Sequence, residues 1–157
     1  MRKKIINSEN KQEIIPDPKW LDIDNIALVE VTSEDQAFPI ECALLPGKVS
    51  LWRASERGKQ MIRLIFDNPQ SIKEIRLKFE ELKVERTQEY VLRCFQDGGQ
   101  SYQEIVRQQW NFSPDGSTCE IEEYEVDLPA VTILELSINP DISDRNVFAS
   151  LNELRLA

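Results

Sequence analysis

The sequence predicts an all-β protein, an antiparallel β-sandwich or jelly roll, and three observations lead to that fold class. Short segments alternate apolar and polar side chains with the period of two that is typical of half-buried strands. Turn-forming Gly, Pro, Asn and Asp separate these segments at intervals of roughly 8 to 15 residues. No stretch shows the longer apolar periodicity of an amphipathic helix. Sandwiches and jelly rolls are the usual folds for such a pattern.

The first half of the chain contains a polar arm followed by short apolar segments. Residues 1–19 lack periodicity and include Pro16 and Pro18, which cannot donate to a β-ladder, so we expect an N-terminal arm. The domain itself is predicted to span residues 20–157. Three apolar segments follow the arm, each ended by a polar or a Pro-Gly turn: residues 26–32, 38–45 and 50–54.

The clearest strands lie at the centre of the chain, in residues 60–79. Asp67 to Gln70 interrupts them, because Asn and Asp favour turns and Pro69 has no N–H for the ladder, so two separate strands are predicted. The second strand alternates strictly between apolar and charged residues: Ile75, Leu77 and Phe79 against Glu74, Arg76 and Lys78.

The second half of the chain is predicted to contain five further strands. The Asp97-Gly98-Gly99 turn joins the first two into a hairpin. The Glu122-Glu123 pair interrupts the alternation and predicts a β-bulge, with most carboxylates of residues 120–127 facing solvent. A calcium-binding surface is the alternative for these carboxylates. The strands are residues 87–96, 101–112, 118–128, 131–138 and 149–156.

Composition and charge limit the possible partners and the cellular location. A chain of 157 residues is the size of one domain. Its net charge of −9 argues against nucleic acid as a partner, because phosphate binding needs a concentrated basic face. The apolar runs are far shorter than the ~20 residues that span a bilayer, so no membrane partner is expected. The basic first residues are not followed by the apolar core of a secretory signal, and we therefore expect a cytoplasmic location.

The absence of histidine argues against catalysis. The chain contains no His, which excludes Ser-His-Asp and Cys-His nucleophiles as well as most zinc sites. Neither a P-loop nor a dinucleotide-binding glycine pattern is present. A pair of carboxylates is enough for glycoside hydrolysis, but 28 acidic residues produce such pairs by chance. We predict that the protein is not an enzyme.

The tryptophans and a local group of basic residues are the candidates for ligand binding. Trp52 precedes a charged loop, and it is expected either to anchor that loop or to face a ligand. Trp110 lies in phase with the apolar side of its strand and is expected in the core. The basic residues close to Trp52 in sequence are Lys48, Arg53, Arg57 and Lys59.

From about Asn25 onward, the order of these features resembles the discoidin family. This family is also called the coagulation factor 5/8 C-type or galactose-binding-like domains, and many members are carbohydrate-binding modules. Met61 stands where the family usually has an aromatic residue. The segments that carry the resemblance are Trp52-Arg53-Ala54, residues 58–69, the strand 72–77, the hairpin 88–102 and the closing strand 149–156.

The resemblance implies an eight-stranded jelly roll without a catalytic site, in which loops at one end recognise the ligand. Many members hold a structural calcium between an acidic loop and a Glu of the last strand. Glu153 matches that Glu and is the candidate metal ligand, whereas residues 45–48 replace the acidic loop, so no cofactor is expected. The residues expected to contact a ligand are Trp52, Arg53, Arg57, Arg86 and Tyr102.

Two functions of different classes follow from these observations. The first is a non-catalytic module that binds a carbohydrate or another small polar ligand with loops at one end of the sandwich. The alternative is an intracellular domain that binds a protein partner with the same loops or with a sheet face. A glycosidase-like enzyme with a carboxylate pair is a third hypothesis. The oligomeric state stays open.

Overall fold

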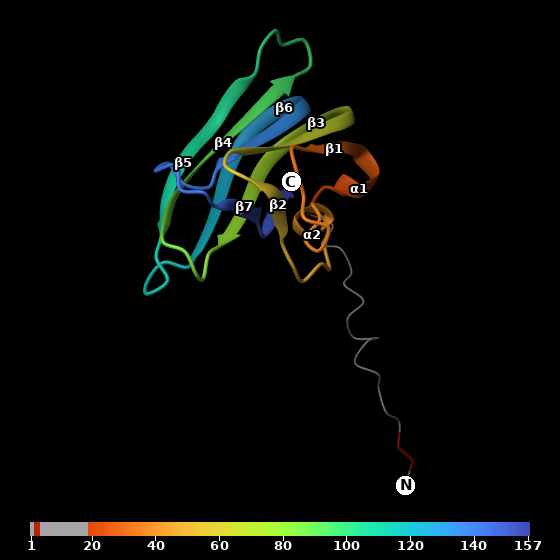
Figure 1. The fold of residues 1–157 in the computed structure, drawn as a ribbon. Helices are drawn as coiled ribbons and strands as arrows, with labels where there is room; N and C mark the ends of the chain where they lie inside the picture. The colour runs from red at the N-terminus through yellow and green to blue at the C-terminus, as the bar shows by residue number, and fades with distance from the viewer. Residues whose placement is uncertain (1, 4–18) are drawn as a thin grey trace.

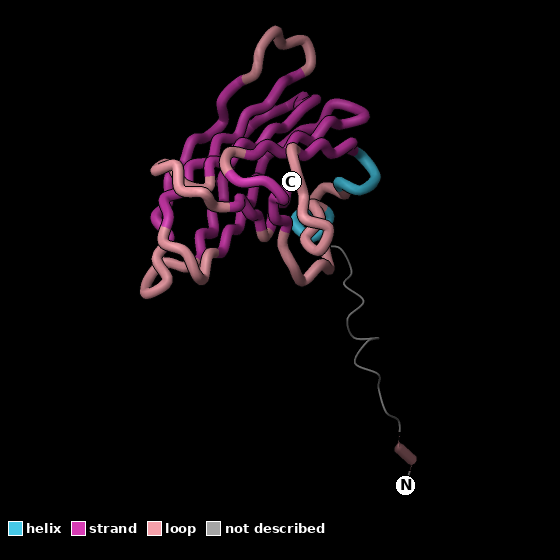
Figure 2. The backbone as a smooth tube through the Cα atoms, viewed as in Figure 1, coloured by secondary structure: helices cyan, strands magenta, loops and turns pink. Residues whose placement is uncertain are grey.

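The computed structural model describes residues 2–3 and 19–157, and in these residues the chain forms two short helices and eight strands (Figure 1 and Figure 2). Most of the predicted N-terminal arm therefore lies outside the described residues. The elements in chain order are α1 (Ile23–Ile26), β1 (Ala27–Val31), α2 (Glu41–Leu44), β2 (Trp52–Arg57), β3 (Gln60–Glu80), β4 (Arg86–Gln96), β5 (Gln103–Phe112), β6 (Cys119–Asn139), β7 (Phe148–Leu151) and β8 (Glu153–Leu156).

The long strands β3 and β6 connect the two layers of an antiparallel sandwich. The first part of β3 pairs with β1 and with the end of β6, whereas its last part pairs with the start of β6 and with β8. The strand order β1-β3-β6-β4-β5 forms one layer, and β8 pairs β3 in the other. β2 and β7 form a separate two-stranded sheet. The predicted all-β sandwich is confirmed.

The predicted break at Asp67 to Gln70 is wrong, because β3 continues through it. The register between β3 and β6 shifts at several points between Ile65 and Glu74, so both strands bend there without ending. Pro69 falls within this irregular part of the ladder, where its missing N–H removes no regular hydrogen bond. For the same reason, residues 118–128 and 131–138 belong to one strand, β6.

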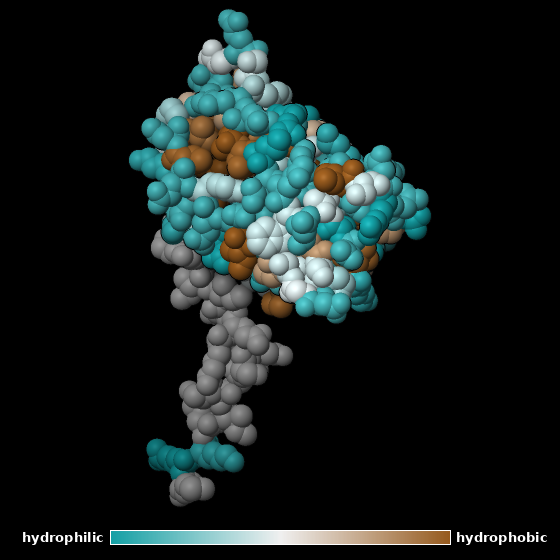
Figure 3. Space-filling view, turned by 90° about the vertical axis from the view of Figure 1, so that its left-hand side faces the viewer, coloured by the Kyte–Doolittle hydropathy of each residue, from teal (hydrophilic) through white to brown (hydrophobic). Residues whose placement is uncertain are grey.

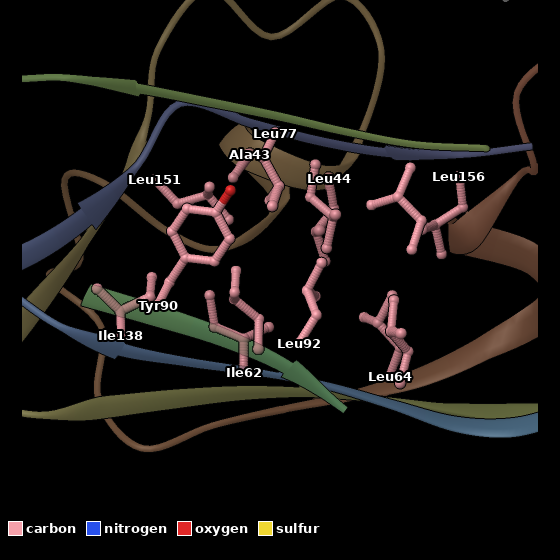
Figure 4. Close-up of a cluster of buried hydrophobic side chains, with 14 of the residues drawn as sticks. Ala43, Leu44, Ile62, Leu64, Leu77, Tyr90, Leu92, Ile138, Leu151 and Leu156 are labelled. Atoms are coloured by element: carbon pink, nitrogen blue, oxygen red, sulfur yellow. The ribbon is translucent and has the colours of Figure 1, made fainter. Parts of the chain in front are cut away.

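The core lies between the two layers. Apolar and polar side chains alternate along the strands, and the apolar ones point between the layers. Ile75, Leu77 and Phe79 are fully buried, as the sequence predicts. Tyr90 stacks on Phe79 with ring centroids 5.1 Å apart. Figure 4 shows side chains from the two layers and from α2 meeting in one cluster, among them Ala43, Leu44, Ile62, Leu64, Leu77, Tyr90, Leu92, Ile138, Leu151 and Leu156.

Two of the predicted segments have a different structure. Residues 38–45 contain α2, because the buried Ile40, Ala43 and Leu44 have the spacing of one face of a helix. The predicted last strand, residues 149–156, consists of β7 and β8. Asn152 separates them: its backbone N–H donates to the Lys78 carbonyl.

The acidic part of β6 differs in one respect from its prediction. The register from Ile75 opposite Tyr124 to Glu80 opposite Cys119 is continuous, so the expected bulge at Glu122-Glu123 is wrong. Normal alternation then turns Glu120 inward, where it is 1% exposed, and leaves Glu122 half-buried. The other three carboxylates of residues 120–127, those of Glu123, Glu125 and Asp127, are exposed, so most of them face solvent as predicted.

The connections between strands gather at two ends of the molecule. The β4–β5 hairpin lies at one end, at the top of Figure 1, and the β3–β4 and β5–β6 connections lie at the other end, at the bottom. We call this second end the loop end; it consists of residues 81–85, 113–118 and 140–147. Because β4 has 11 residues, the two ends lie roughly 35 Å apart along it.

The surface is mostly hydrophilic, with apolar residues in separate places. Figure 3 shows the face on the β5 side, where hydrophilic residues surround a few hydrophobic patches. On the outer face of the first layer, the register aligns Leu28, Ile65, Ile133 and Phe95 across four strands. Neither α1 nor α2, the helices among the described residues, is long and apolar enough to cross a membrane.

Candidate functional site

The depressions at the loop end share one segment, residues 139–148. The largest of them, the loop-end groove, has a volume of about 360 Å³. Two smaller depressions of about 200 and 320 Å³ flank the same segment, and both contain Asp141 and Arg145. The residues that line the loop-end groove are Leu51, Arg53, Glu80, Glu81, Leu82, Lys83, Val84, Asn146, Val147, Phe148, Ser150 and Asn152.

The pairing of β2 with β7 determines which side chains face the groove. Arg53 lies opposite Ser150, and Arg57 lies opposite Phe148. Because side chains alternate along a strand, the intervening Ala149 is buried and these four residues lie on the outer side. The two-stranded sheet therefore supplies the floor of the groove.

Two guanidinium groups contact the ring of Phe148. The Arg53 guanidinium carbon lies 5.0 Å from the centroid of the Phe148 ring, and that of Arg57 lies 5.3 Å from it. Both distances fall within the range of cation–π contacts. Both arginines are exposed, whereas the ring is half-buried. Contact with the ring restricts both guanidinium groups; Arg53 lines the groove, and Arg57 lies beside it.

The acidic residues of the groove wall are already ion-paired. Glu80 lies 3.2 Å from the Lys78 ammonium, and the Glu81 carboxylate accepts a hydrogen bond of 2.9 Å from Arg86 Nε. By contrast, Arg53 and Lys83 make no ion pair with any described residue. The groove therefore presents more available positive charge than negative charge.

Asp141 organises the segment beside the groove. Its side chain is buried, and Oδ1 accepts a hydrogen bond from the Ser143 N–H. Oδ2 lies 3.6 Å from Arg145 Nε, and Arg145 Nη1 donates to the carbonyl of Glu85 in the neighbouring connection. Asp144 has a positive φ of 57°, a backbone conformation that Asp tolerates better than most residues. These contacts fix the loop that carries Asn146.

Trp52 does not face a ligand. It is fully buried, and its indole N–H donates to the Ser33 carbonyl over 3.1 Å. Of the two roles considered for it, the structure supports the anchoring one: Trp52 fixes β2 to the loop after β1. Trp110 is half-buried and packs against the core.

Arg86 also has a structural position. It is buried, and its guanidinium donates to Glu81, to Gln88 and to the Pro140 carbonyl. It lies 4.8 Å from the Phe112 ring centroid. These contacts connect the β3–β4 connection to the 140–147 segment, so Arg86 supports both sides of the loop end and is not a free donor.

Tyr102 lies at the opposite end from the groove. It follows the β4–β5 turn, where its ring packs edge-on against Phe95 with centroids 5.7 Å apart. The structure therefore does not bring the five expected ligand-binding residues together. Only Arg53 lines the groove, and Arg57 lies beside it on Phe148.

Glu153, the candidate metal ligand, lies between two arginines. Its Oε1 is 3.8 Å from Arg76 Nε and 3.8 Å from Arg155 Nε. Among residues 2–3 and 19–157, no group of three or more His, Cys, Asp or Glu side chains could hold a metal ion. The residues around Glu153 therefore do not fit a structural calcium.

Sequence reasoning missed Phe148, Asn146 and Lys83, which line the groove. The partial exposure of Phe148 could have been predicted from the sequence. Alternation in this strand buries Ala149 and Leu151 and places Phe148 on the opposite side, with Ser150. An aromatic residue in that phase is exposed unless another segment covers it. Nothing in the local pattern distinguishes Asn146 or Lys83 from ordinary loop residues.

Comparisons with known proteins identify related folds. No family model matches the sequence, and no curated protein sequence matches it. Among solved structures, a pectin-binding carbohydrate-binding module is 20% identical over 83% of this chain and 89% of its own, with a TM-score of 0.58. A Clostridium perfringens module in complex with GalNAc-β-1,3-galactose is 18% identical over 87% of this chain and 98% of its own, with a TM-score of 0.63.

A third solved structure, a carbohydrate-binding module in complex with 4,5-unsaturated mannuronic acid, is 16% identical over 85% of this chain and 95% of its own, with a TM-score of 0.59. At these identities the similarity concerns the fold. The chain has the galactose-binding-like β-sandwich of these modules, as its resemblance to the discoidin family implies.

Proposed function

We propose that the protein is a non-catalytic carbohydrate-binding module whose site is the loop-end groove. The observation that carries this proposal is the groove itself, an open depression of about 360 Å³ that combines an aromatic ring with amide, hydroxyl and guanidinium groups. Among the structural neighbours, one is a pectin-binding module, one is in complex with GalNAc-β-1,3-galactose and one is in complex with 4,5-unsaturated mannuronic acid, and they support this class of ligand.

The composition of the groove suits a sugar. Asn146, Ser150 and Asn152 supply donors and acceptors for hydroxyl groups. Leu82 is 65% exposed and supplies apolar surface for the C–H face of a pyranose ring, beside Phe148, whose ring contacts Arg53 and Arg57. Asn152 is held in place because its Oδ1 accepts a hydrogen bond from the Glu80 N–H. A fixed amide loses little freedom when a ligand binds.

The groove lacks the arrangement that glycoside hydrolysis requires. A glycosidase needs one carboxylic acid and one free carboxylate on either side of the bond. The two acidic residues of the groove, Glu80 and Glu81, are instead paired with Lys78 and Arg86. We therefore expect no release of reducing sugar from any polysaccharide that the protein binds.

The test is binding to a panel of polysaccharides by affinity gel electrophoresis, with a matched pair of aromatic variants. Phe148→Ala removes the ring that lines the groove and restricts Arg53 and Arg57, and it should lower affinity at least about tenfold, as loss of an aromatic anchor at a binding site usually does. Tyr102→Ala removes an aromatic ring at the opposite end and should bind as the wild type does. If both variants behave alike, or if no polysaccharide binds, the proposed site is wrong.

A protein-binding role is the alternative function, and the same panel separates the two. An intracellular interaction domain would bind no saccharide at all. The cytoplasmic location expected from the sequence stays a prediction, which fractionation of the native cell would test.

A further inference from the structure

The positive groups at the loop-end groove contrast with the rest of the chain. The protein has a net charge of −9, yet four basic residues near the groove make no ion pair with any described residue: Arg53, Arg57, Lys59 and Lys83. Elsewhere, most surface arginines pair with carboxylates, as Arg107 does with Glu89 and Glu104. Lys48 and Lys73 also make no ion pair, but Arg53 and Arg57 are the two arginines of residues 19–157 without one, so their charge is available to an anion from outside.

The carboxylates of the groove do not supply that counter-charge. Glu80 and Glu81 are each held by another cation, Lys78 and Arg86. Their negative charge is therefore largely compensated before any ligand arrives. The net field in the groove comes from Arg53 and Lys83, with Arg57 beside them.

The two arginines are also arranged for an anion. Both guanidiniums contact one ring, at 5.0 and 5.3 Å from its centroid, so their positions are restricted before binding. Neither donates a side-chain hydrogen bond to another described residue. Each therefore keeps its N–H groups available for the paired, forked hydrogen bonds that a carboxylate or a sulfate accepts.

We infer that the groove selects an acidic saccharide, in which a carboxylate or a sulfate group is bound by Arg53 and Arg57. This inference rests on the proposed carbohydrate-binding function and deepens it. The sugar ring lies on the apolar surface of the groove, and the anionic group faces the arginines. A neutral sugar would leave both guanidiniums without a partner.

The test uses ligands that differ only in charge, measured by isothermal titration calorimetry with the whole chain. An oligogalacturonate is compared with its full methyl ester, and a sulfated galactan oligosaccharide with the unsulfated form. We expect each acidic ligand that binds to do so at least about tenfold more tightly than its neutral counterpart, with affinity falling as salt is raised. The two arms show whether the anion is a carboxylate or a sulfate.

Variants link the effect to the arginines. R53Q/R57Q should weaken binding of the acidic ligand at least about tenfold and weaken binding of the neutral ligand much less. R53K/R57K keeps the charge but loses the forked geometry, so an intermediate loss is expected. R107Q makes the same change of charge in an exposed arginine of β5 and should have no effect. Thermal unfolding verifies that each variant is folded.

The outcomes distinguish this inference from the function on which it rests. Equal affinity for charged and neutral ligands, or full affinity in R53Q/R57Q, would overturn the inference and leave a neutral-sugar module. Loss of affinity in R107Q equal to that in R53Q/R57Q would also overturn it, because net charge alone would then explain binding. No saccharide bound by the wild type would reject the proposed function.

Discussion

Glu120 is a buried carboxylic acid with a second carboxylate beside it. Its side chain is 1% exposed, and neither of its oxygens has a hydrogen-bond partner among the described residues. Burial, and next the negative charge of Glu122, raise the pKa of Glu120 to about 7. Tyr90 and Tyr124, whose hydroxyls bond to each other, and Gln108, which donates to Glu122, are its other polar neighbours. Near neutral pH Glu120 therefore exists in both its protonated and its ionised form.

The raised pKa predicts that the stability of the protein falls as the pH rises. In the unfolded chain the pKa of Glu120 returns to about 4.5, so the folded state binds more protons between about pH 4.5 and 7. Its contribution to stability is complete below this window and is lost as the pH rises through about 7. Glu120→Gln removes the charge, and at pH 8 we expect the variant to be about 2 to 3 kcal/mol more stable than the wild type.

Urea unfolding at several pH values measures this difference. Near pH 4.5 the variant and the wild type should have nearly equal free energies of unfolding. Glu125→Gln changes an exposed carboxylate on the same strand and should have little effect at any pH. Parallel pH profiles for Glu120→Gln and the wild type would show that Glu120 is ionised in the folded protein.

At the scale of the elements, a row of alternating charges connects four strands of the first layer. The register places Glu30, Arg63, Glu135 and Arg93 side by side across β1, β3, β6 and β4. Arg63 lies 3.2 Å from Glu30 and 3.3 Å from Glu135, which in turn lies 3.8 Å from Arg93. Glu135 is 7% exposed and neutralises two arginines at once. It is the central member of the row.

Glu135→Gln should therefore lower the free energy of unfolding more than substitution of a residue at the end of the row. Without its charge, Arg63 and Arg93 flank a neutral residue on neighbouring strands, and we expect the free energy of unfolding to fall by about 1 to 2 kcal/mol. Glu30→Gln removes an exposed end of the row and should cost less than about 0.5 kcal/mol. Chemical denaturation measures both, and an equal loss in the two variants would contradict the central role of Glu135.

At the scale of the whole molecule, β3 and β6 hold the two layers together. Each strand pairs in one layer with its first part and in the other with its last part, so the layers share continuous backbone and do not depend on side-chain packing alone. The closing strand β8 then pairs with β3, and the Leu21 N–H donates to the Leu156 carbonyl. The start and the end of the described domain therefore lie side by side.

The ion pairs of Glu153 predict that the thermal stability of the whole protein does not depend on calcium. Glu153, in β8, is ion-paired with Arg76 and Arg155, and binding of a cation would have to displace both. We expect the same Tm with added calcium and with EDTA, measured by calorimetry. A Tm that rises with calcium in the wild type but not in Glu153→Gln would contradict this prediction.

The local pattern of the sequence determined the all-β class, most of the strands and the inward side chains of β3. Alternation within one strand depends only on the pleated backbone, so Ile75, Leu77 and Phe79 could be assigned to the core from their order alone. Strand ends were less predictable. Pro69 suggested the end of a strand, but it lies at a bend, and β3 pairs with β6 on both sides of that bend. The short helix α2 is too brief for a period to be recognised.

Only the tertiary structure decided which residues meet at the groove. Trp52 and Arg53 are adjacent in sequence, yet the pairing of β2 with β7 buries the first and stacks the second on Phe148. Glu120 became a buried acid because β4 and β5 bring Tyr90 and Gln108 close to β6. A site of this kind depends on contacts between segments that are far apart along the chain, and no local pattern encodes which of them will lie side by side.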